Sequence, residues 1–179
     1  MKLFFDISAG FILLVVLFPF LFFVSILILV FDQQNPIFIQ ERLGLMKRQF
    51  RIYKLRTMKR DKITKLGAVL RKTGIDELPQ ILNIVKGDMS FVGPRPLKVA
   101  DVERLGWTAE YYTKRWNKRP GIVGLAQLSP ICDRKVSWFL DKRYVEQAKF
   151  GLDIKIIVSS ALILFMGKTK IQKRFYGRK

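Results

Sequence analysis

The chain has 179 residues, half of them apolar, and carries 33 Lys and Arg against 14 Asp and Glu, a formal net charge of +19. It contains no histidine and a single cysteine, Cys132, which excludes Ser-His-Asp triads, His-based zinc sites, CxxC redox pairs and intrachain disulfides. The positive charge attracts nucleic acid, acidic lipid headgroups or phosphorylated substrates, and any catalysis must use carboxylates, lysines or hydroxyls.

Residues 7–31 form an uncharged, almost wholly apolar run of 25 residues. A helix of this length measures roughly 37 Å and exceeds a hydrocarbon core of about 30 Å. Pro19 lies at its middle, where it removes a helical hydrogen bond and kinks or breaks the helix. Residue chemistry alone favours a spanning helix over a re-entrant hairpin, because kinked spanning helices are common. Either arrangement places residues 32 onward in the cytoplasm, where basic segments remain.

Two short strands are predicted after the apolar run, within residues 35–44 and 48–58. In the second, Phe50, Ile52 and Lys54 alternate with Arg51 and Tyr53. Its basic side chains fit a solvated face, a phosphate-binding edge, a surface on anionic lipid or a site for single-stranded nucleic acid.

A helix is predicted over residues 65–71, with Gly74 as its stop, and an apolar helix over 78–87. Asp76 and Glu77 precede the second helix, with Pro79 in its first turn. Asp is a favoured N-cap, and an isolated Asp-Glu pair is more often a cap than a reacting group. The same position, however, places both carboxylates beside helix N–H groups that can hold a phosphate.

Two Arg-Pro turns follow the acidic pair. Pro94 and Pro96 flank Arg95, and Arg119 opens the Arg-Pro-Gly sequence of residues 119–121. A guanidinium on a rigid backbone suits bidentate phosphate recognition.

With these features together, the chain resembles the monotopic phosphoglycosyl transferases of the bacterial sugar transferase family. The resemblance rests on "IFIQERLG", "FRIYKLRTM", "LRKTGIDELPQILNIVKGDMSFVGPRPL", "RPGIVGLAQ" and "LDKRYVEQAKFGLDIKI". It implies an α+β fold with three parts: a re-entrant helix-break-helix in residues 1–31, a small, mainly helical cytoplasmic catalytic domain with short strands and interfacial amphipathic helices in 32–167, and a basic tail in 168–179. The break falls at Pro19, so the resemblance reverses the preference for a spanning helix.

The resemblance also implies an activity at the bacterial inner membrane: transfer of a sugar phosphate from a UDP-sugar to a polyprenyl phosphate such as undecaprenyl phosphate, with membrane lipid as a further partner and no nucleic acid. Asp76 matches the nucleophile that forms a phosphosugar–aspartyl intermediate, and Glu77 its partner near a magnesium ion, with both carboxylates at the metal. Further positions are implied to bind phosphate or substrate: Arg71, Arg95, Arg119, Asp141 and, as a substitute for a family arginine, Arg134.

Two stretches depart from the family pattern. Phe18 stands where a serine usually precedes the membrane proline, and "SPICDR" at 129–134 replaces the usual "NGR", which leaves the donor sugar open. Cys132 in that stretch is interpreted as incidental. Residues 154–167 are predicted either to pack on the core or to lie among lipid headgroups. The alternative function is a non-catalytic, membrane-tethered module that binds anionic lipid or nucleic acid.

Overall fold

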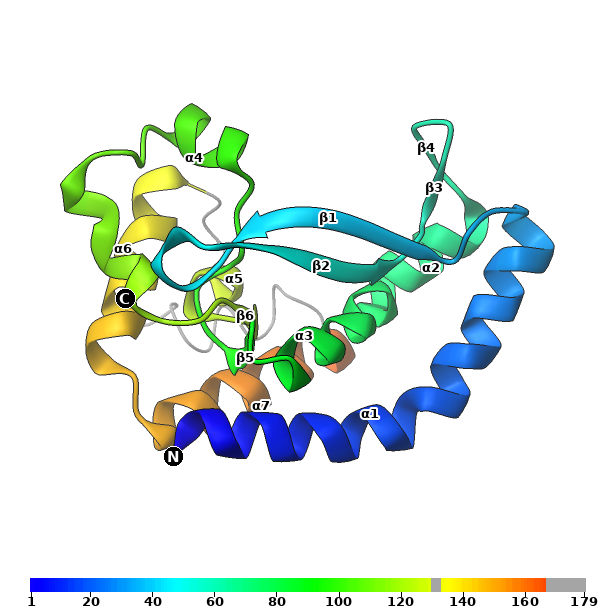
Figure 1. The fold of residues 1–179 in the computed structure, drawn as a ribbon, viewed down its shortest axis with the longest axis horizontal. Coiled ribbons are helices and arrows are strands. Elements are labelled where there is room, and N and C mark those ends of the chain that lie inside the picture. The colour runs from blue at the N-terminus through cyan, green and yellow to red at the C-terminus, as the bar shows by residue number, and fades with distance from the viewer. Residues whose placement is uncertain (130–132, 167–179) are drawn as a thin grey trace. The chain divides into compact units, whose positions relative to one another are not determined.

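The computed structural model describes residues 1–129 and 133–166, which form mixed helical and strand structure (Figure 1). Two compact units are present. The first contains Met1–Glu41 and Arg51–Gly87, and the second contains Arg42–Phe50 and the described residues from Asp88 onward. The predicted mixture of helices with short strands is confirmed.

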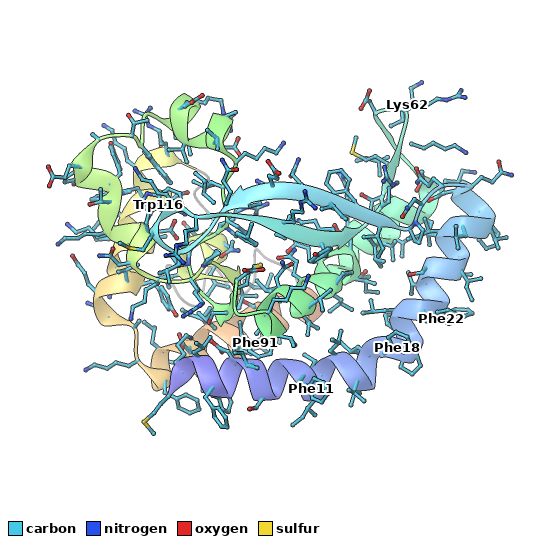
Figure 2. All side chains as sticks on the ribbon, in the orientation of Figure 1. Phe11, Phe18, Phe22, Lys62, Phe91 and Trp116 are labelled. Carbon is cyan, nitrogen blue, oxygen red and sulfur yellow. The ribbon has the colours of Figure 1, made fainter. Side chains whose placement is uncertain are left out.

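The N-terminal apolar run is one bent helix. Helix α1 (Lys2–Leu27) continues into a π-helical turn, η1 (Ile28–Asp32), and Pro19 lies inside α1. Figure 2 shows Phe18 at the bend of the helix. The helix is therefore bent at the expected place but is not interrupted. Within the described residues, it is the one helix long and apolar enough to cross a membrane.

Both arms of α1 contact the first unit. On the first arm, a Cβ on Gly10 would lie 3.2 Å from the Ile84 side chain of α3 (Ile81–Val85). On the second arm, Val24 and Ile28 are buried in a cluster with Leu55 and Leu70. The rest of the helix surface is largely exposed and apolar, with Phe4, Phe11, Val16, Phe18, Phe22, Val30 and Phe31 among its exposed side chains.

The two predicted strands are confirmed as β1 (Ile37–Leu43) and β2 (Gln49–Leu55), which pair across the turn η2 (Leu45–Lys47). Asn83, fully buried, accepts from the Tyr53 N–H and donates to the Arg51 carbonyl, which joins α3 to β2. A small antiparallel hairpin follows, β3 (Met58–Lys59) and β4 (Lys62–Ile63). Helix α2 (Lys65–Thr73) begins with the side chain of Thr64 as its N-cap and ends at Gly74, as expected.

The second unit consists of helices around a short parallel pair of strands, β5 (Ser90–Val92) and β6 (Gly121–Val123). One core cluster centres on Trp107, Trp116 and Trp138, and another on Val92, Tyr144 and Ile156. The remaining elements are α4 (Val99–Leu105), η4 (Glu110–Asn117), α5 (Leu125–Leu128), α6 (Arg134–Gln147) and α7 (Phe150–Met166).

Helix α7 contains most of the segment for which two locations were predicted. Ile156 packs in the core, while Phe150, Ile154, Ile157 and Val158 are exposed. The helix therefore packs on the core with one face and leaves apolar side chains on its outer face. The predicted basic tail, residues 168–179, lies outside the described residues.

Candidate active site

The acidic pair lies in a tight turn rather than at the cap of an α-helix. Gly74, with φ of 72°, ends α2 and also precedes the 3-10 helix η3 (Ile75–Gln80), which leads into α3. Asp76 is therefore the second residue of η3, and the expectation that it serves as an N-cap is wrong. The reason is local: Gly74 serves both helices, so no separate capping residue is inserted. Asp76 and Glu77 both occupy the first turn of η3, whereas the sequence placed them before a helix that begins at residue 78.

The groups around Asp76 shift the pKa of its carboxyl in opposite directions. Partial burial raises the pKa of the half-buried Asp76 carboxyl above its ordinary value, and the negative charge of Glu77 raises it further. The positive charges of Lys54 and Arg71 lower it.

Lys54 holds the second carboxylate. Its Nζ donates to Oε1 of Glu77 at 2.6 Å, and both side chains are partly shielded, with 19% and 34% of their surface exposed. The sequence analysis did not identify Lys54 as a site residue. A signal was present, because Lys54 occupies a position on the strand that alternation assigns to the same face as Phe50 and Ile52.

Arg71 is fixed by a buried threonine. Its Nε donates to Oγ1 of Thr57 at 2.8 Å, and Thr57 is 6% exposed. Helix α2 approaches this point closely because Gly67 has no side chain: a Cβ there would lie 2.1 Å from the Thr57 carbonyl oxygen. The first unit thus brings Arg71, Asp76 and Glu77 together, with Lys54 and Thr57 as partners that were not predicted.

The carboxylate pair fits a magnesium ion. Mg²⁺ prefers oxygen ligands and is commonly bound by one or two carboxylates together with substrate phosphates. Among residues 1–129 and 133–166, no group of three or more His, Cys, Asp or Glu side chains could hold a metal without such help. Burial and the charge of Glu77 both raise the pKa of Asp76, and a bound cation would relieve the repulsion between the two carboxylates.

In the second unit, Arg95 projects from a rigid turn. Pro94 and Pro96 are buried, whereas Arg95 is exposed. The N–H of Gly121 donates to the Pro94 carbonyl at 3.0 Å, so this turn lies beside the one that begins at Arg119. The side chain of Arg119 is half-buried. A small pocket beside the turn is lined by Arg95, Arg115, Trp116 and Lys118, together with Leu43, Gly44, Pro94 and Pro120.

Asp141 lies in the interior of the second unit, where it is 3% exposed. Its Oδ2 accepts from Arg115 Nε at 3.2 Å and from Nη2 at 2.7 Å. Burial raises the pKa of Asp141, and the charge and hydrogen bonds of Arg115 oppose that shift. The sequence analysis did not single out Arg115, which is 26 positions from its partner.

Arg134 is the exposed first residue of α6, and Asp133 caps that helix by accepting from the N–H groups of Lys135 and Val136 at 2.7 and 3.1 Å. Cys132, in the same loop, lies outside the described residues.

Comparison with known proteins identifies the family. The bacterial sugar transferase profile matches residues 1–167. A UDP-N-acetylgalactosamine-undecaprenyl-phosphate N-acetylgalactosaminephosphotransferase of Aeromonas hydrophila is 32% identical over 90% of this chain and 43% of its own length. A UDP-glucose:undecaprenyl-phosphate glucose-1-phosphate transferase of Escherichia coli is 31% identical over 91% and 40%.

A shorter relative aligns over most of both chains. The exopolysaccharide production protein PSS of Rhizobium leguminosarum is 37% identical over 88% of this chain and 92% of its own length. The chain therefore spans less than half of the first two relatives and nearly all of the third.

Proposed function

The chain belongs to the bacterial sugar transferase family, and we propose that it transfers a sugar phosphate from a UDP-sugar to a polyprenyl phosphate, with undecaprenyl phosphate as the acceptor named for two of its relatives. The observation that carries the proposal is the environment of Asp76 in the first turn of η3. Its half-buried carboxyl is influenced by the negative charge of Glu77 and by the positive charges of Lys54 and Arg71.

The proposed reaction has two steps. In the first, a carboxylate oxygen of Asp76 attacks the sugar-bearing phosphorus, the new O–P bond forms and UMP leaves. In the second, a phosphate oxygen of the polyprenyl acceptor attacks the same phosphorus and releases Asp76. A covalent intermediate of this kind divides one difficult transfer into two easier ones.

The positive side chains make attack by one anion on another feasible. Lys54 is bonded to Glu77, and Arg71 is held by Thr57, so both charges are already in position before substrate binds. A magnesium ion held by Asp76 and Glu77 would supply further neutralisation of phosphate charge. Arg95 and Arg119 are proposed to contact a substrate phosphate, with Arg134 as a further contact.

We also propose that α1 enters and leaves the membrane on the cytoplasmic face. The first arm packs on α3 through Gly10, and the second packs on Leu55 and Leu70, so both arms return to the same unit. A straight spanning helix would carry one end across the hydrocarbon core, roughly 30 Å from that unit. The exposed apolar surface around the bend at Phe18 is then covered by acyl chains.

The reaction is tested by supplying a panel of UDP-sugars without acceptor. UMP release and a phosphosugar adduct on the peptide that contains Asp76, detected by mass spectrometry, are expected for the wild type and absent in Asp76→Asn. Asp61→Asn is the matched control, because Asp61 lies in an exposed turn at φ of 61°, where Asn is tolerated. Release of UMP only when acceptor is bound, with no trapped adduct, would replace the covalent step by direct transfer.

The topology is tested by a single cysteine at position 2 in a Cys132→Ser background. In intact cells, a membrane-impermeant thiol reagent should leave this cysteine unlabelled. Labelling from outside would show that α1 spans the membrane. Pro19→Ala, which restores a hydrogen bond and removes a clash, should shift the helix toward the spanning form and lower activity.

The non-catalytic alternative gives a different result in the same preparation. A binding module would show salt-dependent association with nucleic acid or anionic vesicles and no UMP release from any UDP-sugar.

A further inference from the structure

We propose that Arg115 is a positioning residue, which fixes the Pro94-Arg95-Pro96 turn and thereby aims the exposed Arg95 at a substrate phosphate. The inference rests on the proposed function, because it gives Arg95 a ligand. It concerns a buried side chain of η4 that does not reach solvent, since only 1% of its surface is exposed.

The turn is held through two of its carbonyls. The carbonyl of Pro94 accepts from the backbone N–H of Gly121 at 3.0 Å, and the carbonyl of Arg95 accepts from Nη2 of Arg115 at 3.0 Å. Neither proline has an N–H, so both are unable to donate from the backbone to a partner. Of the two anchors, the Arg115 guanidinium is the one supplied by a side chain.

Arg115 is itself restrained by three side chains. Asp141 accepts from Nε and Nη2, which fixes the plane of the guanidinium. The Cζ atom lies 5.2 Å from the centre of the Trp107 ring and 4.6 Å from that of Trp116, which is labelled in Figure 2. A guanidinium restrained by a carboxylate and two aromatic faces has little freedom to rotate, so it can locate a carbonyl accurately.

Stability alone is a weak reason for this arrangement. Buried ion pairs can often be replaced by apolar side chains of similar volume without loss of stability. An apolar replacement, however, would leave the Arg95 carbonyl without the donor that now fixes it. The geometry therefore assigns the pair a role in placing the turn, with Asp141 acting through Arg115 and Arg115 through Arg95.

The test is a double-mutant cycle on UMP release from UDP-sugar. Arg115→Lys keeps the positive charge opposite Asp141 but loses the planar fork, and it should lower kcat/KM by about tenfold or more, the loss expected for a hydrogen bond to a charged group. In an Arg95→Ala background the same substitution should change kcat/KM less than about twofold, because the group being aimed is gone. The KM for the UDP-sugar and kcat should also change in the same proportions in Arg115→Lys as in Arg95→Ala.

A matched control separates positioning from general loosening of the second unit. Tyr144→Phe removes a hydroxyl whose oxygen lies 2.8 Å from both the Val92 carbonyl oxygen and Asp153 Oδ1 in the same unit, and its effect should multiply with that of Arg95→Ala. Thermal melting confirms that each variant is folded. If Arg115→Lys does not fold, Asp141→Asn replaces it, with the same loss of effect expected in the Arg95→Ala background.

The outcomes are distinct. If the losses in kcat/KM caused by Arg115→Lys and by Tyr144→Phe both multiply with the loss caused by Arg95→Ala, the inference is overturned but the proposed function is not. Wild-type kcat/KM in Arg95→Ala would have the same consequence. No UMP release from the folded wild type with any UDP-sugar would overturn the proposed function and the inference with it.

Discussion

Substitution of Gly67 by Ala should disable the acidic site from a distance. Gly67 lies on α2, and a Cβ at this position would meet Thr57 first, not the carboxylates of Asp76 or Glu77. The absence of a side chain at Gly67 lets α2 approach Thr57. A Cβ at this position would lie 2.1 Å from the carbonyl oxygen of Thr57, and 2.7 and 2.8 Å from its C and Cα atoms. All three are backbone atoms, so no side chain can rotate to make room.

The size of the effect follows from two opposing terms. Relative to non-bonded contacts of about 3.5 Å, the closest approach is short by roughly 1.4 Å, so α2 or the Thr57 backbone must move by about 1 Å or more. Overpacking of this kind costs about 1–3 kcal/mol, against a gain of about 1 kcal/mol because Ala favours the helix. The net loss of up to about 2 kcal/mol lowers the melting temperature by up to roughly 8 °C for a chain of this length.

The effect on turnover should be larger than the effect on stability. Thr57 holds Arg71 at 2.8 Å, and a displacement of about 1 Å in a positioning group can reduce a rate by about 100-fold. UMP release and thermal melting in detergent measure the two effects on one preparation. Gly151→Ala is the matched control, because a Cβ there meets nothing within 4 Å, and it should melt at or slightly above the wild-type temperature with unchanged turnover. Equal behaviour of the two Ala variants would refute the reasoning.

Three further predictions follow from the charges of the site and its surroundings. Glu77→Gln removes a negative charge that raises the pKa of Asp76, so the acidic limb of the pH profile of UMP release should move to lower pH. Lys54→Met removes a positive charge that lowers this pKa, so the same limb should move to higher pH. Backbone hydrogen bonds lower the pKa of Asp133 below its ordinary value of 3.8, so Asp133→Ala should lower the melting temperature at neutral pH, and this deficit should shrink as the pH falls below that value. Arg95→Lys should lower kcat/KM by about 10-fold or more without changing the melting temperature, because an ammonium lacks the planar fork, and near-wild-type turnover would show that charge alone suffices.

The elements that the sequence predicted are those with local signals. Alternation predicted β2, and helical spacing with Gly74 as a stop predicted α2. The parallel pair of β5 and β6 was not predicted as a pair, because each strand has three residues and the partners are separated by more than 25 positions. The tight geometry of η3 was also missed, because Asp76 and Pro79 have the composition of an ordinary helix start.

The same distinction holds for the site. The positions of Asp76, Glu77 and Arg71 in one unit followed from their nearness along the chain. Arg115 could not be identified, because a chain with 33 Lys and Arg offers no local reason to select one of them. Its partners Asp141 and Arg95 lie 26 and 20 positions away, so tertiary packing alone reveals the connection.

The structure gives a physical reason for two adjacent carboxylates in a strongly basic chain. Glu77 alone would be harmful to a nucleophile, because its charge raises the pKa of Asp76 and favours the unreactive protonated form. Lys54 bonds to Glu77 at 2.6 Å and also lowers the pKa of Asp76, so one cation on β2 partly opposes the effects of burial and of Glu77. Stabilising a helix end requires only one carboxylate. It requires neither a second carboxylate nor a lysine from a strand more than twenty positions away. The Lys54–Glu77 ion pair is consistent with the proposal that Asp76 reacts, because it balances the charge of the carboxylate beside it.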